Sequence, residues 1–445
     1  MKIKILERFD YLLILSITIL CSLGILFIYS SGINSDGILV SMEYRRQIIW
    51  FSIGFVIMIL LALLDYRKFK KYSLWAYLFL IAALIFTILK GKEINGAKSW
   101  LGIGRLGIQP AELGKILYIL FLANYMDKSK KVNPAKRYST AMMIMLLPVG
   151  LILKQPDLGT ASVYIPIFIF MCYMAEIPLR YIMATLITGI LAIIFTVLPV
   201  WHTQIWLANS SHTSISIINV LTNTKLLLAV IAITTMAVVI SLLGYLFTKK
   251  KYYYWIIYGF AILTIALTFS IPAGKVLKNY QIQRLIIFID PYTDRLGAGW
   301  NIIQSITAIG SGGFLGRGFL NGTQSHLRFL PEQSTDFIFS IFSEEAGFVG
   351  GIIVFSIFFT IFMRIIKIMR NTTSSYGYYI ASGILGMLFF HFCVNVGMVM
   401  GVMPITGIPL PFLSYGGSAL LTNMVSMGLL MSIKSRRLDF NANIL

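Results

Sequence analysis

Residues 11–29 read YLLILSITILCSLGILFIY, an apolar run without a single charged side chain. A helix of about 20 apolar residues crosses the hydrocarbon core of a bilayer, so this run alone predicts a membrane span. The rest of the chain has the same character: 58% of its residues are hydrophobic and 12% are charged, and its mean hydropathy is +0.82. Soluble domains carry about a quarter charged residues. We therefore predict an all-α, polytopic helical membrane protein.

The apolar runs predict about 10–12 transmembrane helices in a single domain that covers residues 1–445. The fifth run is short for a span. No series of alternating ten-residue strands is found, which argues against a β-barrel. The predicted spans lie near residues 11–32, 47–64, 73–90, 108–126, 140–153, 159–176, 181–200, 226–247, 254–272, 336–363, 376–400 and 417–433.

The net charge of +20 is a topology signal rather than a sign of nucleic-acid binding. If the N-terminus is cytoplasmic and the spans alternate, more than half of the 37 Lys and Arg residues fall in inner loops or tails. The positive-inside rule predicts this bias. We therefore expect a multi-pass membrane protein with both termini in the cytoplasm. The first span is too long for a signal peptide and is read as uncleaved.

Two other chemistries are improbable on the sequence. Cys21, Cys172 and Cys393 all lie inside predicted spans and far apart, and no Cys or His group has metal-ligand spacing, which argues against disulfides and structural metals. The glycines at 310–318 are not followed by Gly-Lys-Ser/Thr, so they do not form a nucleotide-binding loop. We read them as flexible turns near a polar headgroup.

The predicted large outer loop, residues 273–335, and the start of the following span hold six of the 17 acidic residues: Asp290, Asp294, Glu332, Asp336, Glu344 and Glu345. Carboxylates in or beside a membrane are expensive, so such a cluster indicates a functional site. Asp290 and Asp294 have no evident helix to cap. A carboxylate here, near Arg284 and other arginines, fits a general base beside an anion-binding surface.

Glu332 and Asp336 have a simpler alternative role. Pro331, Ser334 and Thr335 resemble a helix start, and acids in a first helical turn complement the helix dipole. This alternative and a role in substrate binding both stay open.

Three shorter outward segments also carry unusual residues. The first, GAKSWLGIGRLGIQPAELGK (96–115), places Glu112 and Lys115 three apart on one helix face. The two could neutralise each other in the bilayer or serve the function, and we favour the second reading. The second, KQPDLGTA (154–161), holds Lys154 and Asp157, and Asp157 could simply cap the next helix.

The third segment, GVMPITGIPLPFLSYGGSA (401–419), has three prolines and four glycines between two spans. Irregular backbone at membrane depth survives only inside protein or beside water. We expect a re-entrant or cavity-lining segment.

An outward polar site in a membrane suits an amphipathic, anionic substrate such as a lipid-linked phosphosugar. Glycosyl transfer from a lipid diphosphate needs a base for the acceptor hydroxyl and cations or helix dipoles for the leaving diphosphate. Composition alone does not separate this reaction from transport of the same lipid.

Five stretches in family order closely resemble the SEDS family of cell-wall polymerases, whose branches are RodA, FtsW and SpoVE. The GTQS…FLPEQ wording is more similar to the RodA branch. The stretches are AKSWLGIGRLGIQPAELGK, KQPDLGTA, RLIIFIDPYTDRLGAGWNIIQSITAIGSGG, GTQSHLRFLPEQSTDFIF and TGIPLPFLSYGGS.

The resemblance implies a peptidoglycan glycosyltransferase that uses lipid II in cell elongation and shape maintenance. It implies that Asp294 is the essential catalytic aspartate. This sequence departs from the family at Arg295, where proline is usual, and at Ser334, which is often His. Arg295 beside Asp294 would favour the charged carboxylate and so lower its basicity. A lipid II flippase and a scaffold for a class B penicillin-binding protein are the alternatives.

The resemblance also implies a class B penicillin-binding protein (a transpeptidase) as partner, beside membrane lipids and without nucleic acid. No cofactor is certain, and a divalent cation is the one considered. Family members have ten spans, so the extra two are assigned to an inserted hairpin near 201–252. The residues expected to bind substrate are Trp100, Glu112, Lys115, Lys154, Asp157, Arg284, Gln304, Ser305, Glu332, Asp336 and Ser414.

Overall fold

The computed structural model describes residues 8–94, 96–103, 106–206, 216–276, 279–291 and 297–436. The chain divides into two compact units, one made of residues 1–177 and 294–445 and the other of residues 178–293. Each unit is described by itself.

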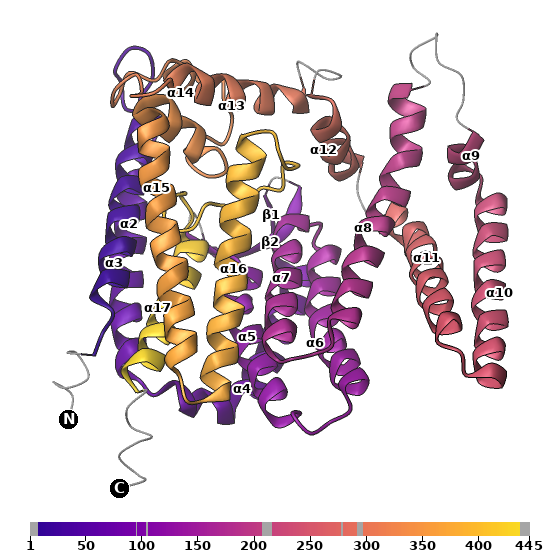
Figure 1. Cartoon of the computed structure of the whole chain (residues 1–445). Coiled ribbons are helices and arrows are strands. Elements are labelled where there is room, and N and C mark those ends of the chain that lie inside the picture. The colour runs from indigo at the N-terminus through magenta and orange to yellow at the C-terminus, as the bar shows by residue number, and fades with distance from the viewer. Residues whose placement is uncertain are drawn as a thin grey trace, which may run out of the picture. The chain divides into compact units, whose positions relative to one another are not determined.

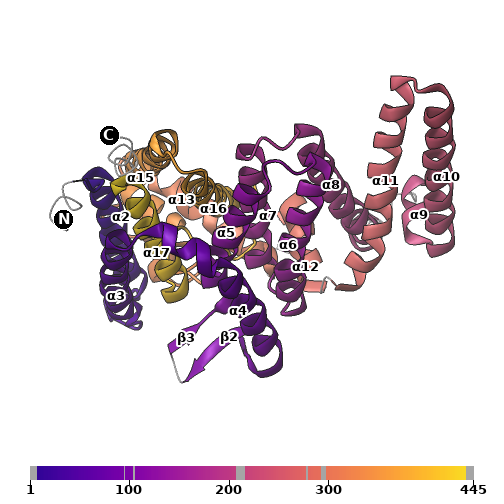
Figure 2. The same cartoon turned by 90° about the horizontal axis from the view of Figure 1, so that it is seen from below.

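The first unit is a helical bundle in which α16 is the central helix (Figure 1). Most side chains of α16 are buried, because it packs against α5, α7 and α15. Figure 2 shows α17 lying against α3, a packing that joins the two ends of the chain. The helices of this unit are α2 (Tyr11–Ser31), α3 (Glu43–Leu63), η1 (Tyr66–Lys68), α4 (Phe69–Lys90), α5 (Pro110–Lys128), α6 (Pro134–Lys154), α7 (Leu158–Met174), α13 (Ala298–Gly312), α14 (Thr323–His326), α15 (Ile338–Asn371), α16 (Ser375–Val399) and α17 (Gly417–Ser435).

The second unit is built on the antiparallel pair α10 (Thr224–Thr248) and α11 (Lys251–Val276). The tight turn between them places Lys249 in the left-handed region, with φ 52°. Helix α8 (Leu179–Trp201) packs against α11, and α12 (Asn279–Ile289) packs against α8 through a small cluster of Val197, Ile282 and Ile286. The π-helical turn η2 (His202–Trp206) and the short helix α9 (Ser216–Thr222) complete this unit.

Each of the twelve predicted spans coincides with a helix, which confirms the all-α, polytopic membrane fold. Nine helices in the described ranges are long and apolar enough to cross a membrane by length and composition; α5, α7 and α17 are the shorter or more polar ones. The fifth span is longer than predicted. It begins at Pro134, because Asn133 caps it by accepting a hydrogen bond from the backbone N–H of Ala135 at 2.9 Å.

A small three-stranded antiparallel sheet was not predicted. Strands β1 (Lys92–Ile94), β2 (Ala97–Ile103) and β3 (Leu106–Ile108) pair in chain order within the segment between α4 and α5. Trp100 lies over Gly107 across the β2–β3 pair, and a Cβ on that glycine would stand 2.9 Å from the ring. These strands are too short and too rich in glycine to give a hydropathy signal.

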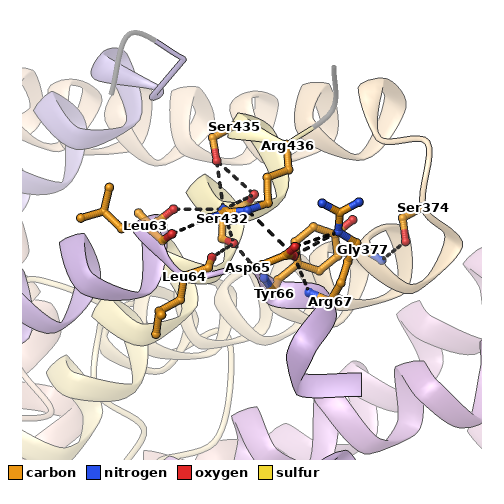
Figure 3. Close-up of polar contacts among 11 residues, drawn as sticks. Leu63, Leu64, Asp65, Tyr66, Arg67, Ser374, Gly377, Ser432, Ser435 and Arg436 are labelled. Atoms are coloured by element: carbon orange, nitrogen blue, oxygen red, sulfur yellow. Dashed lines mark hydrogen bonds and ion pairs between the residues drawn. The ribbon is translucent and has the colours of Figure 1, made fainter. Parts of the chain in front are cut away.

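Polar contacts fix the end of the first unit at which α3 and α17 both finish (Figure 3). The Arg436 guanidinium donates to the carbonyl oxygens of Ala62 at 3.2 Å and Leu63 at 2.5 Å, which are among the last carbonyls of α3. The backbone N–H of Tyr66 donates to Oγ of Ser432 at 3.1 Å. These bonds satisfy backbone groups that a helix end would otherwise leave unpaired.

Candidate functional site

Lys115 is the most unusual residue of the bundle, because its side chain is fully buried. It lies on the second turn of α5, and its Nζ is 2.7 Å from Oε1 of Glu112 and 3.0 Å from Nε2 of His391 on α16. The other ring nitrogen of His391, Nδ1, lies 3.1 Å from the carbonyl oxygen of Pro409. Since a carbonyl only accepts, Nδ1 carries the proton and Nε2 accepts from the Lys115 ammonium.

The predicted irregular segment is confirmed as non-helical backbone buried in the bundle. Residues 401–416, between α16 and α17, form turns and extended chain, and Leu410, Phe412 and Leu413 are buried. Side chains from the helices satisfy its carbonyls: Nδ2 of Asn395 donates to Ile408 at 2.8 Å, and Nε2 of Gln47 donates to Ser414 at 3.1 Å. Polar side chains thus replace the water that irregular backbone would need in a membrane.

Asp157 caps α7, as one of its two sequence interpretations predicted. It accepts hydrogen bonds from the backbone N–H of Thr160 at 3.0 Å and from Oγ1 of Thr160 at 2.9 Å. It also accepts from Nε2 of Gln109 at 2.5 Å, at the start of α5. Burial, with a smaller contribution from the nearby Glu112, raises the pKa of Asp157 despite these hydrogen bonds. The cap therefore also links α7 to the helix that carries Lys115.

Ser305 and Ser414 are the other predicted residues that the structure places in buried polar contacts. Oγ of Ser305, on α13, lies 2.7 Å from Oγ of Ser340 and donates to the carbonyl oxygen of Val399 at 2.7 Å. Oγ of Ser414 accepts from the backbone N–H of Leu410 at 2.8 Å. Ser305 thus joins α13 to α15 and α16, and the Oγ of Ser414 closes a turn within the irregular segment.

The helix start predicted at Pro331–Thr335 is wrong. Residues 331–336 form turns, and α15 begins at Ile338 without an acidic residue in its first turn. Glu332 is exposed, so the dipole explanation does not account for it. Asp336 is half-buried, and its carbonyl accepts from Nδ2 of Asn395 at 2.9 Å. The backbone around Glu332 is left-handed, with φ 48°, and a helix cannot begin there.

Among the described residues of the first unit, the remaining predicted residues make no contact with Lys115. Lys154 is exposed at the end of α6, Gln304 is half-buried on α13 and Trp100 lies on the small sheet. Arg284 belongs to the second unit. Asp294, the predicted catalytic residue, lies outside the described residues.

The sequence analysis did not predict three polar residues that form hydrogen bonds described above: His391, Asn395 and Gln109. His391 and Asn395 stand four apart in the apolar stretch LFFHFCVNVG, which places them on one helix face. That spacing of two polar residues in a predicted span was a usable signal. Gln109 directly precedes Pro110, and nothing in its sequence context predicts its bond to Asp157.

The buried Lys–Glu–His cluster and the irregular membrane-depth segment define a polytopic membrane protein with a polar site inside its bundle. The family model of the FtsW, RodA and SpoVE proteins, described as cell cycle proteins, matches residues 10–206 and 202–438. The chain therefore belongs to this family, which confirms the resemblance seen in its motifs.

Individual relatives support membership of the same family. The chain is 50% identical to the peptidoglycan glycosyltransferase RodA of Treponema pallidum (strain Nichols), covering 98% of this chain and 100% of that one. It is 30% identical to the peptidoglycan glycosyltransferase MrdB of Escherichia coli (strain K12), covering 94% and 93%. It is 29% identical to the stage V sporulation protein E of Bacillus subtilis (strain 168), covering 95% and 96%.

Solved structures share the fold. One chain, from a study of polymerization and crosslinking by a peptidoglycan synthase complex, superposes with a TM-score of 0.65 at 24% identity, covering 96% of this chain and 98% of that one. The Rod shape determining protein RodA of Thermus thermophilus superposes with a TM-score of 0.59 at 22% identity, covering 96% and 97%.

Proposed function

We propose that this protein is a peptidoglycan glycosyltransferase that polymerises lipid II during cell elongation and shape maintenance. The observation that carries the proposal is the 50% identity, over nearly the whole of both chains, to a protein named peptidoglycan glycosyltransferase RodA. A buried, paired cation inside the bundle supports it, since the substrate is an anionic lipid diphosphate.

In the proposed reaction, the growing glycan chain moves from its undecaprenyl diphosphate to a hydroxyl of lipid II. Asp294 takes the proton of that hydroxyl as its oxygen attacks the anomeric carbon of the donor. The bond from this carbon to the diphosphate oxygen breaks, and the diphosphate leaves with the electron pair. Attack from the opposite face inverts the α-linked donor into a β-1,4 product.

The substrate-binding role falls to the predicted polar residues. Lys115, held in place by Glu112, would attract the negative charge of the diphosphate from within the bundle. Asp157, which caps α7, would hold α7 against the start of α5. Trp100, Lys154, Arg284, Gln304, Ser305, Glu332, Asp336 and Ser414 complete the proposed set. Preorganised charges stabilise a leaving anion better than mobile ones do, which favours such a fixed network.

The proposed orientation places both termini in the cytoplasm and the large loop outside, from the distribution of Lys and Arg. We expect a class B penicillin-binding protein as partner, because the sequence has no Ser-x-x-Lys nucleophile in a suitable outer domain. The structural likeness to a chain of a peptidoglycan synthase complex agrees with this. Co-purification in mild detergent tests it, and full activity alone together with failure to co-purify counts against it.

A divalent cation at the substrate diphosphate is the proposed cofactor. Within the described ranges no group of three or more His, Cys, Asp or Glu side chains could hold a metal ion, so such a cation would arrive with the substrate. EDTA should lower polymerisation, and added Mg²⁺ should restore it. An unchanged rate in EDTA would indicate that Lys and Arg side chains of the protein, rather than a metal ion, neutralise the charge of the diphosphate.

Purified protein and labelled lipid II in detergent provide the direct test, because no second leaflet exists there. Ladders of glycan strands on a gel are expected, and the Asp294→Asn variant is the matched control. Unchanged lipid II in the presence of the partner would favour the flippase or the scaffold.

A further inference from the structure

Two adjacent glutamates near the start of α15 are buried, and no Lys or Arg of the described residues pairs with either. Glu344 is 0% exposed and Glu345 is 2% exposed, and in the described part of the chain the only ionisable partner of either is His326, whose Nε2 lies 3.9 Å from Oε1 of Glu345. A buried carboxylate that lacks a counter-charge must be held by hydrogen-bond donors. Most of the donors come from the segment between the last turn of α13 and the end of α14, and one comes from α2.

Glu344 binds the start of α14. Its Oε1 accepts from the backbone N–H groups of Thr323 at 2.8 Å and Gln324 at 3.0 Å, and from Oγ1 of Thr323 at 3.0 Å. Oγ of Ser311, at the end of α13, adds a longer contact of 3.4 Å. One carboxylate oxygen therefore joins the last turn of α13 to the first turn of α14.

Glu345 binds the middle of the same segment and also a third element. Its Oε2 accepts from the backbone N–H of Leu320 at 3.1 Å. Its Oε1 accepts a short hydrogen bond from Oγ of Ser30, near the end of α2. Nδ1 of His326 lies 3.0 Å from the carbonyl oxygen of Ile33, so α14 also contacts the chain after α2. Figure 1 shows α2, α14 and the start of α15 together at this end of the first unit.

The backbone of α15 is opened where these glutamates lie. In a continuous helix the N–H groups of Phe348 and Val349 would donate to the carbonyls of residues 344 and 345. They donate instead to Gly313 at 3.0 Å and Phe314 at 3.1 Å, on the segment after α13.

The carbonyls left free by this opening are satisfied by the same segment. Arg317 and Gly318 donate their backbone N–H groups to Glu344 and Glu345, both at 3.0 Å. Gly347 makes the break possible with a left-handed φ of 65°. Gly316 fits because a Cβ there would stand only 2.1 Å from the carbonyl oxygen of Glu345. The glycine-rich stretch does form turns, as predicted, and its backbone is docked against the break in α15.

We propose that Glu344 and Glu345 are positioning residues: they clamp the segment 311–326 into the break in α15 and so fix the end of α13. Helix α13 begins at Ala298, four positions after Asp294 in the sequence, and Ser305 anchors its middle to α15 and α16. A displacement of α13 would be expected to displace the proposed base as well, and misplacement by about 1 Å can cost about 100-fold in rate. The inference rests on the proposed function for its catalytic consequence, whereas the clamp itself is a matter of structure.

The test uses the full-length protein and the variants Glu344→Gln, Glu345→Gln and Glu344→Ala, measured for lipid II polymerisation and for backbone hydrogen exchange. The glutamine variants keep one acceptor oxygen and guard against loss of folding in the alanine variant. We expect Glu344→Ala and Glu345→Gln, each of which removes an acceptor oxygen, to lower kcat about 10- to 100-fold with KM nearly unchanged. Glu344→Gln keeps the one oxygen through which Glu344 accepts, and it should change kcat and exchange less. Exchange at residues 317–324 should accelerate at least about tenfold while α16 stays protected, since each lost acceptor leaves a buried donor unpaired.

Asp36→Asn is the matched control, because Asp36 is an exposed carboxylate in the turn after α2, outside the proposed site. It should change neither readout. Wild-type kcat in a glutamine variant whose loop exchanges faster would overturn the positioning role, and a raised KM with unchanged kcat would reassign the glutamates to binding. Unaltered exchange would overturn the clamp. If the wild-type protein makes no glycan, the proposed function is wrong. The hydrogen-exchange measurement would still test whether Glu344 and Glu345 hold the segment 311–326.

Discussion

The ammonium of Lys115 lies 3.0 Å from Nε2 of His391, although 276 positions separate the two residues. This contact joins α5 to α16. The other ring nitrogen of His391, Nδ1, binds the irregular segment at the carbonyl oxygen of Pro409. A buried cation is therefore tied to the buried non-helical backbone through one neutral ring. The predictions below begin with this pair.

Lys115→Ala should lower lipid II turnover strongly, by at least about 100-fold, while the protein still inserts and folds. Its loss leaves Glu112 buried and unpaired, so some stability is lost as well, about 3–5 kcal/mol for a broken buried pair. Turnover and melting temperature in detergent measure the two effects separately. The double variant Glu112→Gln/Lys115→Met removes both charges at similar volume. Recovery of turnover in that variant would show that the pair only neutralises itself.

His391→Phe should destabilise the bundle by about 1–3 kcal/mol, because it removes the donor to the Pro409 carbonyl and leaves the Lys115 ammonium with Glu112 but without its second acceptor. Polymerisation should fall less than in Lys115→Ala, since the cation remains. Melting temperature and turnover are the measurements. His391→Gln can still accept and donate, and it should lie between the wild type and His391→Phe. Wild-type stability in the Phe variant would contradict the assigned hydrogen bonds.

Asp294→Asn should nearly abolish polymerisation, because a general base contributes about 10²–10⁴-fold to rate. The substitution keeps shape and polarity, so folding and lipid II binding should survive, as measured by melting temperature and by binding of labelled lipid II. Asp290→Asn is the matched control and should cost less. The reverse result, an inactive Asp290 variant beside an active Asp294 variant, would show that the wrong carboxylate was chosen.

Protonation of Asp10 at acidic pH should lower the stability of the folded protein. Its carboxylate lies 2.8 Å from Nη2 of Arg364 and 3.1 Å from Nζ of Lys434. Burial opposes ionisation, but the hydrogen bonds from Arg364 and Lys434 outweigh it and hold the pKa of Asp10 below its ordinary 3.8. A depressed pKa stabilises the fold above the unfolded value of 3.8, and this contribution is lost as the pH falls through the lower folded pKa.

Melting temperature in detergent between pH 3 and pH 7 measures this effect. Asp10→Asn should lower stability by about 1.5–3 kcal/mol near neutrality, the range for hydrogen bonds to charged groups. The difference from wild type should shrink toward pH 3. A difference that stays constant with pH would assign the loss to packing or to the helix cap instead of to the charge.

Local signals in the sequence were enough for the helices. Each predicted span falls on a helix, and the cap at Asp157 was one of its two stated roles, since hydropathy and capping act over a few residues. The same local reasoning failed where distant chain intervenes. Helix α15 begins at Ile338 rather than at the predicted position, and the glycines near 316 pack against Glu345. The residues that determine both conformations are distant in the sequence, so a short stretch of sequence does not reveal them.

The sequence by itself determined the class of protein: a bilayer-spanning helix must satisfy its own backbone, so apolar length alone fixes the spans. The family motifs added the set of polar residues, without saying which of them meet. Only the tertiary structure decided that Lys115 pairs with His391 as well as Glu112, and that Glu344 and Glu345 bind backbone N–H groups of the glycine-rich segment. Buried polar groups must find partners wherever packing brings donors and acceptors within about 3 Å, and that proximity is a property of the folded bundle rather than of sequence spacing.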